Sequence, residues 1–152
     1  MTTSTLRRIA DLSIDADGSS TRLASQWLAK SASDFEVPVS ELDRLDLCLN
    51  EVLANIISHG LGSEAKPLVH VVLQVEHDDD GTSVATVTVS DAGPAFDITL
   101  AGDHCRPASL ADAQPGGLGL LMIRSFSDDL RYRYSGGQNH LSFAVRWINS
   151  DE

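Results

Sequence analysis

The 152-residue sequence predicts one α+β domain, built as a two-layer sandwich of helices packed on a sheet. Three observations support this fold class. The length fits a single hydrophobic core, and apolar patterns typical of helices and of strands are both present. Their order is a strand, two helices, two strands, a helix and a final hairpin, which differs from the regular alternation of a βαβ fold.

The first part of the chain carries one strand pattern and one helix pattern. Loose alternation over residues 6–14 predicts the strand, and a turn rich in aspartate and glycine follows it. Ser19 or Ser20 is expected to cap a helix that reaches about residue 35, with Trp27 and Leu28 on its apolar side.

A second, longer helix is predicted after Pro38. Ser40 and Asp43 resemble a capping box at its start. Its apolar residues recur at intervals of three and four, as expected for a core-facing stripe; they are Leu42, Leu45, Leu49, Val52, Leu53 and Ile56. Gly60 and Gly62 are expected to end the helix.

The second half of the chain predicts four strands and one helix. Residues 68–76 and 84–90 read as strands joined by a solvated turn of three aspartates and a glycine, and a helix is expected over 118–126. A closing hairpin turns at residues 136–137. The irregular connection between the middle strands and the helix, about 94–116, is long enough to be a lid or a binding loop.

Charge and hydropathy exclude several classes of protein. The 11 lysines and arginines against 22 aspartates and glutamates give a net charge of −11, which disfavours duplex DNA and anionic membranes as partners. No apolar run approaches the roughly 20 residues that a transmembrane helix needs, so we expect a cytoplasmic protein without a membrane segment. Cys48 and Cys105 lack the spacing of a zinc site and are expected to be buried thiols.

The first group of candidate site residues lies on the second helix. Glu51, Asn55 and His59 are spaced by four residues and form one polar stripe. A solvated helix face is the ordinary explanation. However, Asn55 lies in a strongly apolar stretch and needs partners there. Its amide oxygen suits Mg²⁺, and Glu51, one turn earlier, is placed to act as a general base.

The second group follows the strand over residues 84–90. Asp91 has the parity of that strand's apolar face, so its carboxylate would need a donor such as the exocyclic amine of a purine. Gly93 would let the backbone approach a flat ring, and Phe96 lies three residues further on. A plain turn, in which Asp91 bonds its own backbone, is the alternative.

The third group is a glycine-rich helix start. Gly117 and Gly119, with Leu118 and Leu120, would present backbone N–H groups to an anion at the positive end of the helix dipole. The segment matches neither the P-loop nor the dinucleotide-binding fingerprint, so those two nucleotide folds are set aside.

Together the three groups resemble the N, G1 and G2 boxes of the GHKL ATPase superfamily, in the same order and at similar distances. The resemblance spans nearly the whole chain. It implies the Bergerat fold, a mixed but mostly antiparallel sheet covered on one face by about three helices. It also implies that residues 1–152 form a single histidine-kinase-like ATPase domain with its lid at about 94–116.

Within that superfamily the short domain and its compact lid are similar to the anti-sigma-factor serine kinases. This resemblance implies a homodimer that uses ATP and Mg²⁺ to phosphorylate a serine of a STAS-type anti-anti-sigma partner, and that also sequesters a sigma factor. The alternatives are a partner-switching module that ATP organises without phosphotransfer, and a detached catalytic domain of a histidine kinase.

The resemblance also assigns residue roles. Glu51 would take the proton from the attacking serine, Asn55 would coordinate Mg²⁺, and Asp91 would accept from the adenine amine. The other residues of the boxes would contact the nucleotide; they are Gly93, Phe96, Gly117, Leu118, Gly119 and Leu120. His59 and the lid residue Arg106 remain open, since a helix-terminal imidazole can serve the dipole and a loop arginine can be solvated.

Overall fold

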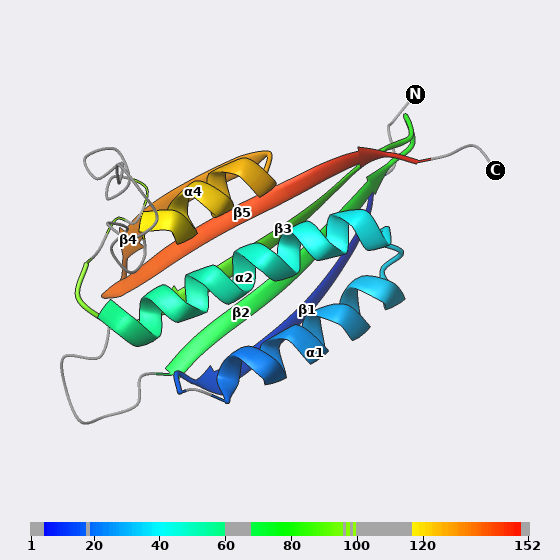
Figure 1. Ribbon diagram of the computed structural model, residues 1–152. Helices are drawn as coiled ribbons and strands as arrows, with labels where there is room; N and C mark the ends of the chain where they lie inside the picture. Colours follow the sequence, from blue (N-terminus) through cyan, green and yellow to red (C-terminus); the bar gives the residue numbers. More distant parts are fainter. Residues whose placement is uncertain are drawn as a thin grey trace.

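The computed structural model describes residues 5–17, 19–59, 68–95, 97, 99 and 117–149. Its elements in chain order are β1 (Thr5–Asp15), α1 (Ser20–Asp34), α2 (Val39–His59), β2 (Leu68–Asp78), β3 (Thr82–Asp91), α4 (Gly117–Phe126), β4 (Asp129–Ser135) and β5 (Gln138–Ile148). The strands form one sheet in the order β1-β2-β3-β5-β4, and α1, α2 and α4 pack on one of its faces (Figure 1). The predicted two-layer α+β sandwich is therefore confirmed.

The sheet is antiparallel at each of its described pairings, where a mixed but mostly antiparallel sheet was expected. Two short turns account for much of this pattern. β2 and β3 are joined by a turn in which Gly81 has a φ of 88°. β4 and β5 are joined at Gly136 and Gly137, whose φ values of 63° and 76° favour glycine in a two-residue hairpin.

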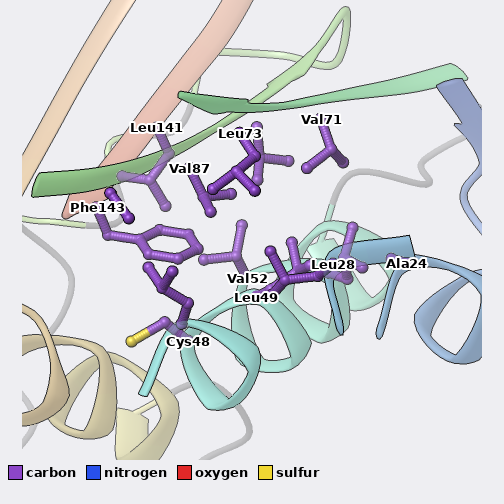
Figure 2. Close-up of a cluster of buried hydrophobic side chains, with 14 of the residues drawn as sticks. Ala24, Leu28, Cys48, Leu49, Val52, Val71, Leu73, Val87, Leu141 and Phe143 are labelled. Carbon is purple, nitrogen blue, oxygen red and sulfur yellow. The ribbon is translucent and has the colours of Figure 1, made fainter. Parts of the chain in front are cut away.

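The core lies between the sheet and the helices. Alternate residues of the strands point toward the helices, and the predicted apolar stripe of α2 packs against them. Figure 2 shows the centre of this cluster, with Phe143 of β5 beside the side chains of α2. Completely or almost completely buried side chains from the helices and strands are Leu28, Leu45, Leu49, Val52, Leu53, Val71, Leu73, Val87 and Phe143.

The helix starts differ from the sequence prediction in detail. Ser19 does occupy the N-cap of α1, but its side chain makes no capping bond; its hydroxyl instead donates to Asp17 Oδ1 at 2.6 Å. α2 begins at Val39, so the capping box expected from Ser40 and Asp43 is wrong. Ser40 lies inside the first turn, and its hydroxyl donates to Glu41.

The helices cover the core as amphipathic elements. α2 carries the longest buried stripe and contacts both α1 and α4. None of the helices in the described part of the chain combines the length and the apolar character needed to span a bilayer.

Candidate functional site

The predicted site residues that the structure describes gather at one end of the sandwich. Asp91 is the last residue of β3, and the register places it between Val69 at the start of β2 and Asn139 at the start of β5. Figure 1 shows the C-terminal end of α2, the first turn of α4 and the start of β5 at this same end. Groups from segments far apart in the sequence thus share one end of the fold.

Asn55 is buried, with 8% of its surface exposed. Its Nδ2 is inaccessible to water and has no hydrogen-bond partner among the described residues. A buried amide nitrogen without a partner costs free energy, so its retention points to a ligand or an ordered water at this position. Glu51, one helical turn earlier, is only partly buried and so remains within reach of a substrate.

Asp91 is also 8% exposed, as its strand parity predicted. Its Oδ1 accepts from the backbone N–H of Gly93 at 2.9 Å and from Asn139 Nδ2 at 3.2 Å. The self-contained turn considered from the sequence is therefore present. Both hydrogen bonds that reach this carboxylate from the described part of the chain go to Oδ1.

One residue of this end was missed in the sequence. Asn139, 8% exposed, donates through Nδ2 to Asp91 and to the carbonyl of Pro94 at 2.9 Å, and its Oδ1 accepts from the Tyr132 hydroxyl at 2.5 Å. The sequence does contain a pattern that could have identified it. Asn139 alternates with Leu141 and Phe143 along one strand, which places its polar side chain on the face of the core.

The glycine-rich segment forms the first turn of α4, which contains no acidic residue. Its first N–H groups have no partner within the helix, and the helix dipole favours an anion there. α4 is held from α2 at its other end, because Arg44 Nε donates to Phe126 O at 2.9 Å and Arg44 Nη2 pairs with Asp128 at 3.0 Å. Arg124 of α4 is exposed and donates to the carbonyl of Thr99.

Burial controls the ionisation of Cys48, which lies on α2 close to Glu51. Loss of water raises the pKa of the Cys48 thiol to about 11, the nearby charge of Arg44 lowers it, and that of Glu51 raises it. Cys48 Sγ lies 3.8 Å from Ile123 O of α4. The predicted burial of this thiol is confirmed, and it is not ionised at neutral pH.

Several predicted residues lie outside the described residues, namely Phe96, Arg106 and Cys105, together with most of the expected lid. The side chains of His59, Leu118 and Leu120 are likewise not described; the structure gives only that His59 ends α2 and that the other two lie in α4. Their roles stay predictions.

A groove of about 310 Å³ lies over the β3, β5 and β4 strands and is lined by Thr86, Arg131, Ser142 and Arg146 among others. None of the predicted site residues lines it. It is therefore separate from the end of the fold that carries Asp91 and Asn55.

Residues 14–145 match the family model of the histidine kinase-like ATPase domain, and the chain belongs to this family. It is 36% identical over 98 residues to the serine/threonine-protein kinase BtrW of Bordetella bronchiseptica, over 64% of this chain and 66% of that protein. The chain thus covers slightly less than two thirds of that relative's length.

Among solved structures, the chain is similar to the RsbU and RsbW domains of Rv1364c from Mycobacterium tuberculosis, with a TM-score of 0.58 and 15% identity over 93% of this chain and 33% of that one. This likeness confirms the GHKL ATPase type of fold. The resemblance of the three boxes to the GHKL ATPases is borne out by the family match, and the similarity to a serine/threonine-protein kinase agrees with the resemblance to the serine kinases of this superfamily.

Proposed function

We propose that this chain is an ATP-dependent protein serine kinase and anti-sigma factor. Its substrate would be a serine of a STAS-type anti-anti-sigma protein, and in its other state it would sequester a sigma factor, as a cytoplasmic homodimer. The relative named as a serine/threonine-protein kinase supports the class of reaction.

One observation carries the proposal for the site. Two buried polar residues lie at the same end of the fold: Asn55 has a buried Nδ2 without a partner among the described residues, and both hydrogen bonds that reach the Asp91 carboxylate from those residues go to Oδ1. The glycine start of α4 lies at that end as well (Figure 1). The Asn55 Nδ2 can donate to a ligand oxygen while its amide oxygen serves a cation, the Asp91 carboxylate can accept from an adenine amine, and the backbone N–H groups at the start of α4 suit phosphate oxygens.

The proposed transfer follows from these groups. The serine hydroxyl oxygen of the partner bonds to the γ-phosphorus, the bond from that phosphorus to the β–γ bridging oxygen breaks, and ADP leaves with the electron pair. Glu51 takes the hydroxyl proton, for which its partial exposure suits it. The N–H groups of the first turn of α4 hold phosphate oxygens, so most of the catalysis is positioning and charge stabilisation.

Magnesium fits the residues present. The Asn55 side chain would hold Mg²⁺ through its amide oxygen, an oxygen ligand of the kind this ion prefers. When bound, the ion would neutralise charge on the phosphates. The buried, unpartnered Nδ2 of the same side chain supports a role for Asn55 beyond helix packing.

The test is Glu51→Gln, assayed with Mg-ATP and candidate STAS proteins. We expect acid-stable phosphoserine with the wild type and a loss of about 100-fold or more in kcat for the variant, because general-base catalysis contributes about 10²–10⁴-fold. ATP affinity should change little, since a glutamine side chain has nearly the same size and shape as the glutamate it replaces.

Two other outcomes would replace this proposal. Partner regulation that survives Glu51→Gln would favour a module in which ATP only organises the lid. Acid-labile phosphohistidine on the acceptor would indicate a detached histidine-kinase catalytic domain.

A further inference from the structure

Asn139 occupies an unusual place for a polar side chain. It lies directly across from Asp91 on the neighbouring strand and points to the same face as the core residues Leu141 and Phe143. With 8% of its surface exposed, its amide needs hydrogen bonds within the protein.

The contacts of the amide fix its orientation. Three acceptors surround Nδ2: Asp91 Oδ1 at 3.2 Å, Gly93 O at 3.3 Å and Pro94 O at 2.9 Å. On the other side, the Tyr132 hydroxyl donates to Oδ1 at 2.5 Å. An amide turned by 180° would set its oxygen against three acceptors, so the NH₂ group must face Asp91.

Asn139 therefore bonds to one oxygen of the Asp91 carboxylate, Oδ1. Asn139 Nδ2 and the Gly93 N–H both donate to Oδ1, and together they fix the plane of the carboxylate and the backbone that follows it. Because the plane of the carboxylate is fixed, the position of its second oxygen, Oδ2, is fixed as well. A chain of hydrogen bonds thus runs from Tyr132 on β4 through Asn139 on β5 to Asp91 on β3.

We propose that Asn139, held by Tyr132, is a positioning residue that makes the site selective for a purine with an amine at position 6. The inference rests on the proposed function, in which Asp91 meets the base. A fixed carboxylate oxygen accepts from the amine of adenine and repels the carbonyl oxygen at position 6 of hypoxanthine or guanine. The two nearby donors, Gly93 N–H and Asn139 NH₂, are already occupied by Asp91, so they are not offered to that carbonyl.

Asn139→Asp tests this role directly. The change removes the amide that donates to Asp91 Oδ1 and places a second carboxyl group beside it, so the Asp91 carboxylate is no longer held in one orientation as the acceptor for the base. We measure the affinity of the whole chain for Mg-ATP and for Mg-ITP, which differ at position 6 of the base. The wild type should prefer ATP by about tenfold or more, the value of one hydrogen bond to a charged group. In Asn139→Asp that preference should fall at least tenfold.

Tyr132→Phe is the second variant, which removes only the hydroxyl that orients Asn139. The preference for ATP over ITP should also fall in this variant, but by less than in Asn139→Asp. If Asn139→Asp does not fold, the result for Tyr132→Phe tests the inference alone. Asn149→Asp is the matched control at the opposite end of β5. Asn149 Oδ1 accepts from Ser83 and Trp147 there, and the aspartate preserves an acceptor. Its ATP preference should equal that of the wild type.

The possible results separate the two ideas. Equal losses of ATP and ITP affinity in the Asn139 and Tyr132 variants, with the preference unchanged, would overturn this inference and leave the proposed function standing. The same would follow if Asn149→Asp changed the preference as strongly. A wild type that binds neither nucleotide would overturn the proposed function and this inference with it.

Discussion

At the scale of single residues, burial controls the chemistry of Cys48. Because burial raises its pKa to about 11 from 9.0, the folded protein binds more protons than the unfolded chain between these two pH values. The free energy of unfolding should therefore fall as the pH rises from about 9 to 11. Urea denaturation across this range measures it, with Cys48→Ala as the comparison.

The alanine variant should start from a lower stability, because it leaves a cavity in the core, but its alkaline decline should be shallower. The thiol of the native wild type should also react slowly with alkylating reagents at pH 8. Parallel stability curves for the two proteins would show that other groups cause the decline.

Asp91 and Asn139 show what the sequence reveals about single residues. The burial of Asp91 was predicted because its parity follows from the local residues of one strand. Its contact with Asn139 was not, because it joins positions 48 residues apart and depends on the register between β3 and β5. Alternation gives the face on which a side chain lies, but only the pairing of strands gives its neighbour.

At the scale of elements, the attachment of α4 depends on Arg44. Its guanidinium donates to the last carbonyl of α4 and to Asp128. Burial acts to raise the pKa of Asp128, but the hydrogen bonds from the Arg146 backbone and from Arg44, with the charges of both arginines, lower it below 3.8. This interaction therefore contributes to stability above about pH 3.8 and is lost as the pH falls through the lowered pKa.

Arg44→Met keeps the aliphatic stem and removes both hydrogen bonds. We expect the free energy of unfolding at pH 7 to fall by about 1–2 kcal/mol, a value already reduced for the partial exposure of the pair. Arg7→Met is the matched control, because Arg7 pairs with Glu76 at 3.3 Å through a side chain that is 59% exposed, against 28% for Arg44, and should change stability by at most about 0.5 kcal/mol. Equal losses in the two variants, measured by urea denaturation, would contradict a special role for Arg44.

Helix interiors were easier to predict than helix starts. The apolar stripe of α2 repeats over several turns, so each residue of it supports the same prediction. The start of α2 depends on one backbone hydrogen bond, in which the carbonyl of Pro38 accepts from the N–H of Leu42. This bond makes Val39 the first residue of the helix. Ser40 is then past the capping position, whatever its side chain favours.

At the scale of the whole molecule, the proposed nucleotide would join elements that the fold brings together only at one end. Residues from α2, β3 and α4 would bind the same ligand, and each of these elements contributes to the common core. Figure 2 shows the part of this core that α2 and β3 supply. Ligand binding to the native state alone stabilises it by about 2.7 kcal/mol at 100 times the dissociation constant. For a domain of this size that corresponds to a rise of several degrees in Tm.

Thermal melts with and without Mg-ATP therefore test the arrangement as one unit. The wild type should gain several degrees, and Asp91→Asn should lose most of that gain because an amide nitrogen replaces an acceptor facing the adenine amine. Asp11→Asn is the control, since Asp11 contacts His70 on the exposed side of the sheet at 3.1 Å, and it should keep the full shift. An unshifted wild type at saturating ATP and ADP would mean that the three groups no longer bind nucleotide, because binding restricted to the native state must raise Tm.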